Sequence, residues 1–190
     1  MKLHLGCYQK KIHGYVNVDI RPEVQPDLVD DVFTLERVQS ESADVIYACH
    51  VLEHATRQVA LQALSRWHQV LKSGGTLRLA VPDMRAVCEY YVNHGDLKEL
   101  SAFFWGSQKH EHDIHYTGWD FETLQQDLVA IGFENIRRYD WRETEHFYVD
   151  DYSQCYMPRM SYKTRRPDGE IAGTLLSLNV EAKKRVITYV

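Results

Sequence analysis

The side chains best suited to chemistry follow three short hydrophobic runs of the sequence. Gly6 comes directly after the first run, and a glycine at a strand end lets a ligand approach the backbone closely. Asp19 lies near the end of the second run, and its carboxylate can accept hydrogen bonds from both hydroxyls of a ribose. The third run, Asp44–Ala48, leads into the loop Cys49–His54, which holds two histidines and one glutamate. Because ligands of open parallel sheets bind beyond the carboxyl ends of the strands, these three ends predict one common site.

Composition bounds the class of protein. The chain has 190 residues, 44% of them hydrophobic, which predicts a globular protein with one domain. Its 22 basic and 27 acidic residues give a net charge of -5, which argues against a nucleic-acid partner. No apolar stretch reaches the roughly 18 residues of a membrane helix, and the N-terminus lacks the apolar core of a signal peptide. We therefore expect a cytoplasmic protein with no membrane partner.

The cysteines are far apart in the sequence and form no C-x-x-C pair. They are Cys7, Cys49, Cys88 and Cys155. This spacing fits isolated thiols in a reducing compartment better than a disulfide or zinc framework.

Apolar periodicity predicts the elements that position these residues. Strands are expected at residues 3–5, 15–20, 27–29, 44–48, 76–81 and 133–139. The run at 44–48 is strong and is expected to lie centrally in the sheet. The gap between the first two strands is too short for the crossover helix that neighbouring parallel strands usually need. The first helix is therefore expected to be a single turn or missing.

The clearest helical periodicity begins after Thr56, which can cap a helix that ends near Gly74. Its apolar stripe is expected to consist of Val59, Ala63, Trp67 and Val70 or Leu71. Further helices are expected at residues 84–94, 96–105 and 121–131, the first and last capped by Asp83 and Asp120.

The alternation of strands and helices predicts an α/β fold, a three-layer sandwich around a mainly parallel sheet. We expect a single domain over residues 1–190, with a helical lid inserted at about 84–118 and an irregular tail with edge strands at 141–190. Within the tail, residues 175–180 and 185–190 are expected to finish the sheet as an antiparallel hairpin.

Four segments, in order, resemble successive motifs of class I S-adenosylmethionine-dependent methyltransferases. They read LHLGC from Leu3, GYVNVDI from Gly14, DVIYACHVLEH from Asp44 and LKSGGTLRLAVPD from Leu71. The closest subgroup is the small type 11-like methyltransferases, which have a shortened segment after the first strand. The resemblance covers about residues 2–140 and implies a Rossmann-like fold of about seven strands. It also implies S-adenosylmethionine as the cofactor.

The resemblance implies roles for particular residues. In the family, a glycine loop contacts the methionine part, an acid after strand two holds the ribose, an acid after strand three meets the adenine, and the strand-four loop lines the sulfonium. The matching cofactor residues here are Gly6, Cys7, Tyr8, Asp19, Ile20, Asp31, Val32, Cys49 and His50. Asp30 is the rival of Asp31 for the adenine position.

Tyr8 departs from the family pattern, which usually has a second glycine at this position. A side chain here can fill the space that the methionine carboxylate needs. Either the Tyr8 ring swings outward and caps the site, or the cofactor loop is degraded and the fold serves another purpose.

The run from His110 to His115 contains three histidines and two acids, which are residue types that bind zinc or iron. It lacks the helical i, i+4 spacing of an H-E-x-x-H site and is expected to form a loop, so no metal is predicted. Because this loop would arch over the strand ends, His115 is the candidate general base facing a substrate. Glu53 and His54 are expected to have structural roles.

A basic cluster in the tail has two interpretations, a solvated surface or a site for an anionic group of a substrate. It consists of Arg159, Lys163, Arg165 and Arg166.

These observations predict methyl transfer from S-adenosylmethionine to a small-molecule or saccharide-like acceptor, with catalysis resting mainly on holding the acceptor in line with the methyl group. Two other classes remain open. One is a non-catalytic methyltransferase-like binding module, which Tyr8 favours. The other is a nicotinamide-dependent oxidoreductase, which normally has the fuller G-x-G-x-x-G loop.

Overall fold

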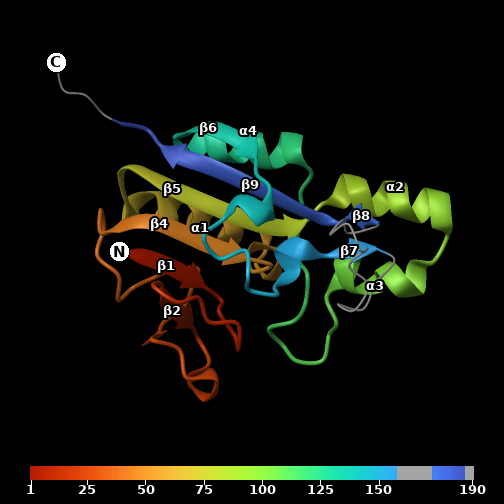
Figure 1. Cartoon of the computed structure of the whole chain (residues 1–190), viewed down its shortest axis with the longest axis horizontal. Coiled ribbons are helices and arrows are strands. Elements are labelled where there is room, and N and C mark those ends of the chain that lie inside the picture. Colours follow the sequence, from red (N-terminus) through yellow and green to blue (C-terminus); the bar gives the residue numbers. More distant parts are fainter. Residues whose placement is uncertain (158–172, 187–190) are drawn as a thin grey trace.

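The computed structural model describes residues 1–157 and 173–186, and these form a seven-stranded sheet flanked by helices (Figure 1). The strands lie in the order β3-β2-β1-β4-β5-β9-β6. They are β1 Lys2–Leu5, β2 Val16–Asp19, β3 Leu28–Val29, β4 Ala43–Cys49, β5 Leu71–Pro82, β6 Phe133–Arg138 and β9 Ser177–Lys184. Strands β1 to β5 pair in parallel, whereas β9 runs antiparallel to β5 and β6. The predicted α/β class and mainly parallel sheet are confirmed, and β4 is the middle strand.

The helices follow the predicted order along the chain. The α-helices are α1 Arg57–Val70, α2 Met84–His94, α3 Leu97–Trp105 and α4 Phe121–Ile131. Short 3-10 helices are η1 Pro22–Val24, η2 Leu52–His54, η3 Trp141–Glu143 and η4 Tyr152–Gln154, and a small second sheet pairs β7 Tyr156–Met157 with β8 Thr174–Leu175. Between β1 and β2 the chain forms only turns, as the short gap predicts.

The predicted helix starts are confirmed by their caps. The side chains of Thr56, Asp83 and Asp120 each accept a hydrogen bond from the backbone amide three residues further on. Gly95 and Gly132 end α2 and α4 in the left-handed conformation that glycine adopts without steric cost.

The end of α1 differs from the prediction. The helix stops at Val70, and the extended Leu71 pairs with Ala43 as the first residue of β5. Gly74 has a left-handed φ of 74°, but it lies within β5 and does not cap the helix. Because the sheet pairs the backbone directly after the helix, no glycine cap is needed. The buried stripe of α1 is Ala60, Ala63, Leu64, Trp67 and Val70, and Val59 is exposed.

The tail also differs from the predicted edge hairpin. Residues 177–184 form one continuous strand, β9, inserted between β5 and β6. The polar residues after Val180 do not form a turn, because Glu181 bonds to Arg78 and the Lys184 ammonium donates to the Leu71 carbonyl at 2.8 Å. Arg185 lies beyond the strand, and residues 187–190 lie outside the described residues.

One face of the sheet carries the main hydrophobic core. Alternate residues of the strands, including Leu3, Ile46 and Leu77, pack against the buried faces of α1 and α4. Trp67 of α1 is fully buried here, and its indole nitrogen donates to the Val32 carbonyl at 2.7 Å. This bond fixes the chain after β3 to the helix layer.

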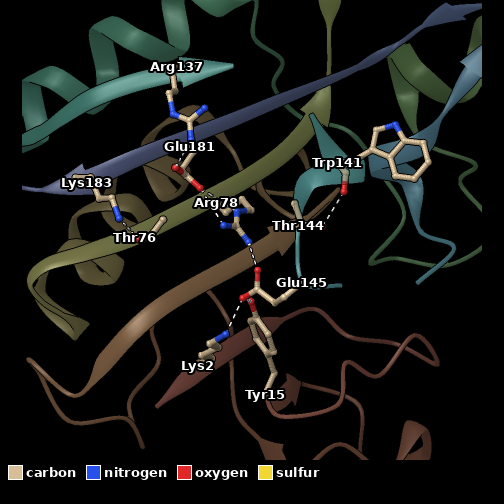
Figure 2. Close-up of polar contacts among 10 residues, drawn as sticks. All are labelled: Lys2, Tyr15, Thr76, Arg78, Arg137, Trp141, Thr144, Glu145, Glu181 and Lys183. Carbon is tan, nitrogen blue, oxygen red and sulfur yellow. Dashed lines mark hydrogen bonds and ion pairs between the residues drawn. The ribbon is translucent and has the colours of Figure 1, made fainter. Parts of the chain in front are cut away.

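The other face of the sheet carries a polar network that Figure 2 shows. Glu145 follows η3, and its carboxylate accepts hydrogen bonds from Lys2 and Tyr15 at 2.7 Å each and from Arg78 at 2.9 Å. Arg78 of β5 also bonds to Glu181 of β9 at 2.9 Å. The segment that contains η3 and η4 is thereby fastened across β1, β5 and β9.

Helices α2 and α3 lie beyond one end of the sheet, beside β7 and β8 (Figure 1). They form a separate small core with these strands, consisting of Val87, Tyr90, Leu100, Phe103, Met157 and Leu176. Since α2 begins directly after β5, this unit stands at the carboxyl end of the parallel strands. None of the helices in the described part has the length and apolar character of a membrane span.

Candidate active site

The carboxyl ends of β2, β1 and β4 meet, because Leu5 pairs with Val18 on one side and with Ala48 on the other. The amides of Gly6 and Cys7 donate to the Val18 carbonyl at 2.9 and 3.1 Å. The chain therefore bends at Gly6 against the end of β2. The structure brings the first and second predicted strand ends into direct contact.

Gly6 is required by both conformation and space. Its φ is 67°, and a Cβ atom at this position would lie 2.5 Å from the Val51 Cγ2 atom of the loop after β4. Cys7 next to it is buried, and burial raises the pKa of its thiol to about 11. The bend thus packs tightly on Val51, and Cys7 carries a neutral thiol at physiological pH.

We expect Gly6→Ala to lower the free energy of unfolding by about 2–4 kcal/mol, because the left-handed φ and the contact with Val51 both oppose a side chain. Gly14→Ala is the matched control, since Gly14 has a φ of 80° but nothing within 4 Å of its added Cβ. It should cost only about 1 kcal/mol. Urea denaturation measures both, and equal losses would contradict the close packing at Gly6.

Asp19 is 2% exposed and faces the Gly6 bend. Its Oδ2 accepts from the Tyr8 amide at 2.8 Å, and its Oδ1 accepts from the amide and Nε of Arg21, both at 3.0 Å. Burial would raise the pKa of the Asp19 carboxyl, but the hydrogen bonds from Arg21 and Tyr8 outweigh it and hold that pKa below its usual value. Asp19 is therefore an ionised acceptor. The sequence gives no sign that Arg21 is its partner.

Tyr8 has a left-handed φ of 43°, which is unfavourable for a residue other than glycine, asparagine or aspartate. Its ring is 48% exposed and lies over the Arg21 guanidinium, at 4.8 Å from the ring centre. The ring thus stands outside the bend, on top of the Arg21–Asp19 pair.

The residues predicted for the adenine side differ in what their side chains can offer. Ile20 is 46% exposed, so it presents a free apolar surface beside Asp19. Asp31 is partly exposed and accepts from the Phe33 amide with Oδ1, whereas Val32 is buried in the main core. The rival Asp30 is buried and uses both oxygens to accept backbone amides. Of these residues, Ile20 and Asp31 therefore have the exposed surface that contact with an adenine needs.

The loop after β4 is held in a fixed shape. His50 has a φ of 51°, and its Nε2 lies 3.2 Å from the Ser177 hydroxyl. Its ring also lies beside that of Tyr152, with centroids 5.3 Å apart. Cys49 at the end of β4 has a pKa well above its usual value because it is buried. These contacts tie the strand-four end to β9 and η4.

Glu53, His54 and His115 come together at this loop, although 60 residues separate the last two in the sequence. The Tyr116 amide donates to the Glu53 carbonyl at 2.9 Å, which draws the segment after α3 across the loop. The rings of His54 and His115 meet edge to face, with centroids 4.9 Å apart. The side chains of Glu53 and His54 therefore face His115, a proximity that the sequence analysis does not predict.

In this cluster, burial and the neighbouring groups shift the pKa values of the side chains in opposite directions. Burial would raise the pKa of the Glu53 carboxyl, but His50 and the two other imidazoles hold that pKa below its usual value. Burial lowers the pKa of His115, and the charge of Glu53 opposes this shift only in part. The cluster thus holds a charged carboxylate beside a neutral His115 imidazole.

The remainder of the histidine-rich run lies elsewhere. His110, Glu111 and His112 are exposed and, with Arg21 and Glu23, line an open cavity of about 440 Å³. The run is therefore divided between this cavity, next to the Asp19 side of the site, and the cluster around Glu53. The basic residues Arg159, Lys163, Arg165 and Arg166 lie outside the described residues.

Residues 7–79 match a protein family described as a methyltransferase domain. No curated protein sequence matches this chain. Solved structures with a similar fold include S-adenosylmethionine-dependent methyltransferases from Methanosarcina mazei and Archaeoglobus fulgidus. The first has a TM-score of 0.59 at 14% identity, covering 98% of this chain and 92% of that one. The second has a TM-score of 0.56 at 15% identity, covering 96% and 85%.

A third similar structure is a putative methyltransferase from Haloferax volcanii in complex with the Trm112 methyltransferase activator. Its TM-score is 0.57 at 14% identity, with 100% of this chain and 83% of that one covered. The matched segment contains the Asp19 strand end and the loop after β4, and the fold is that of the similar structures. The chain thus contains a segment similar to a methyltransferase domain, and it shares its fold with S-adenosylmethionine-dependent methyltransferases.

Proposed function

We propose that this chain transfers a methyl group from S-adenosylmethionine to a hydroxyl oxygen of a small-molecule or saccharide-like acceptor. The observation that carries the proposal is the meeting of two sets of groups at one end of the sheet. Asp19 faces the Gly6 bend on one side of β1. On the other side, beyond β4, Glu53, His54 and His115 form a polar cluster.

The residues at the first of these positions fit an adenosine. Asp19 is a buried ionised acceptor, which suits two vicinal ribose hydroxyls. The Arg21 side chain that now bonds to it is partly exposed, so a ribose can take its place while the Tyr8 amide bond remains. Ile20 supplies an apolar surface for the adenine, and Asp31 can accept from its exocyclic amine.

S-adenosylmethionine supplies a methyl group that is already activated by the positive sulfur. The task of the chain is to hold the acceptor close and in line with that group. Gly6, Cys7 and Tyr8 would contact the methionine part, and Cys49 and His50 would line the sulfonium end. We place the acceptor between this end and the unit of α2 and α3, with residues 84–118 as its lid.

His115 is the group that we assign to the acceptor side. Its Nδ1 lies 3.0 Å from the Phe103 carbonyl, and a carbonyl can only accept, so Nδ1 carries the proton. The lone pair is then on Nε2. This arrangement supports a role for His115 as the general base.

Labelled S-adenosylmethionine tests the proposal directly. Incubation of the chain with panels of hydroxylated small molecules and saccharides should yield a labelled acceptor, and His115→Ala should lower that yield. Methylation of amines alone, with no labelled hydroxyl compound, would contradict the acceptor class.

A second candidate function is a non-catalytic binding module, and the conformation of Tyr8 favours it. Tyr8 has a left-handed φ at a position where the family has a glycine. Its ring stacks over Arg21, which is bonded to Asp19. The two functions differ in whether the wild-type protein binds the cofactor.

We expect wild-type protein to bind S-adenosylhomocysteine, and Tyr8→Gly to bind it more tightly, by up to about 10-fold. The substitution removes the ring from Arg21 and relieves about 1 kcal/mol of backbone strain. Glu41→Gly is the control, because Glu41 has a φ of 54° but precedes β4 at the opposite end of the sheet. Calorimetry that detects binding only in Tyr8→Gly would favour the binding module.

A further inference from the structure

We propose that Glu53, His54 and His115 bind one divalent transition-metal ion. The sequence predicts no metal, because the histidine-rich run at 110–115 forms no ligand set by itself. The fold changes the set of residues: it separates His115 from His110 and His112 and places it beside two residues of the loop after β4. One ligand atom from each of the three side chains lies within 4.8 Å of the other two.

The two imidazoles are oriented as metal ligands are. The Nδ1 atom of His54 lies 3.2 Å from the Ile114 carbonyl, and that of His115 lies 3.0 Å from the Phe103 carbonyl. Both Nδ1 atoms must carry the proton, because a carbonyl oxygen only accepts. Each Nε2 then presents a lone pair, and a backbone carbonyl on the opposite ring nitrogen is the usual support of a metal-bound histidine.

The Glu53 carboxylate is the observation that calls for a cation. Its side chain is 0% exposed, and within the described part of the chain neither of its oxygens accepts a hydrogen bond. His50 Nδ1 lies 3.1 Å from Oε1, close enough for an ion pair but without hydrogen-bond geometry. A buried carboxylate with unpaired oxygens is costly unless a cation or a metal neutralises it. A bound ion supplies that positive charge.

The donor set indicates which ions fit. Two imidazole nitrogens and one carboxylate oxygen are ligands of Zn²⁺, Co²⁺, Mn²⁺ and Fe²⁺ in sites that keep open coordination positions. Ca²⁺ and Mg²⁺ prefer oxygen ligands throughout and are poorly matched.

A role for the ion in binding the methyl acceptor rests on the proposed function. His115 can act as the base only in the metal-free protein, because its Nε2 would be a ligand once the ion is bound. We place the open coordination positions of the ion toward the acceptor. They favour an acceptor with two neighbouring oxygen atoms, such as the vicinal diol of a saccharide. The site itself can be tested without any methyl transfer.

The test uses full-length protein freed of metal with a chelator and titrated with Co²⁺, followed by its visible absorption bands, and with Zn²⁺ and Mn²⁺ in a calorimeter. We expect one ion per chain. His115→Ala and Glu53→Gln should each weaken binding by about 10- to 100-fold or more. The double variant His110→Ala/His112→Ala is the matched control and should bind as the wild type does, because both residues are exposed and outside the cluster.

The inference is overturned if wild-type protein binds no ion at one equivalent, or if His115→Ala binds as tightly as wild type. It is also overturned if the double variant alone loses the ion. Thermal melting without metal checks that each variant folds, and His115→Ala, which alters a loop, decides the matter if Glu53→Gln does not fold. Asp19→Ala should bind S-adenosylhomocysteine more weakly yet keep the ion, so failure of the cofactor site and failure of the metal site can be told apart.

Discussion

Asp19→Ala is expected to weaken S-adenosylhomocysteine binding by about 30- to 150-fold, or 2–3 kcal/mol, which is the contribution of hydrogen bonds to a charged group. The carboxylate is 2% exposed and accepts the Tyr8 amide of the Gly6 bend, so it lies where the ribose is proposed to bind. Calorimetry of the wild type and the variant measures the difference. Asp19→Asn, which keeps one acceptor oxygen, should fall between them.

Two further variants separate recognition of the ribose from general effects of charge. Arg21→Ala should bind the ligand at least as tightly as wild type, because it frees the Asp19 carboxylate from its present partner. Asp44→Ala should leave affinity unchanged, since Asp44 is exposed at the start of β4, at the opposite end of the sheet. Wild-type affinity in Asp19→Ala, with a normal melting temperature, would show that Asp19 does not hold the cofactor.

The sequence predicts the parallel half of the fold because its signals are local. Each of β1, β2 and β4 is an apolar run that stops at a turn or polar residue, and Thr56, Asp83 and Asp120 cap the helices at the predicted positions. In these segments the side-chain pattern and the backbone signals agree, so tertiary contacts do not override them.

The prediction fails where a distant partner decides the structure. Glu181 and Lys184 look like the polar turn of a hairpin, but Arg78 and the Leu71 carbonyl pair them inside the sheet. These partners lie more than 100 residues earlier in the sequence. Polarity along a segment cannot reveal that its charged side chains find partners on the neighbouring strand of a sheet.

In the candidate site, too, local signals can be predicted from the sequence and long-range contacts cannot. Gly6 and Asp19 can be found from the sequence, because the ends of adjacent parallel strands meet wherever the strands are placed correctly. The contact of His115 with Glu53 and His54 depends on how the chain after α3 crosses the loop, which the Tyr116 amide bond to the Glu53 carbonyl fixes. A loop crossing has no periodicity in the sequence, so this proximity emerges only from the folded chain.

The stability of the protein is expected to fall as the pH drops below 6.5, and His146 is the residue to which we assign much of this loss. Its side chain is 3% exposed, lies 4.2 Å from the Tyr47 ring centre, and its Nδ1 has no hydrogen-bond partner in the described residues. Burial, and after it the charge of Arg78, lower the pKa of His146 from 6.5 to about 4. The folded protein therefore keeps this imidazole neutral at pH values where the unfolded chain protonates it.

The sign follows from that difference in proton binding. Above pH 6.5, His146 is neutral in both the folded and the unfolded chain, so stability does not depend on its protonation. Between pH 6.5 and about 4 only the unfolded chain takes up the proton, and the free energy of unfolding falls by about 3 kcal/mol in total. His146→Phe keeps a ring against Tyr47 but cannot take up a proton, so it should flatten the decline. His13→Gln, at an exposed histidine, should not.

Urea denaturation at several pH values between about 7 and 5 measures the effect. That range excludes the carboxylate Glu145, whose hydrogen bonds to Lys2 and Tyr15 help to hold its pKa below its usual value, so its loss of stability begins only at lower pH. His4 remains in both variants, and because burial lowers its pKa too, a smaller decline should persist in His146→Phe. An unchanged slope in that variant would mean that His146 is already protonated, or exposed, in the folded protein.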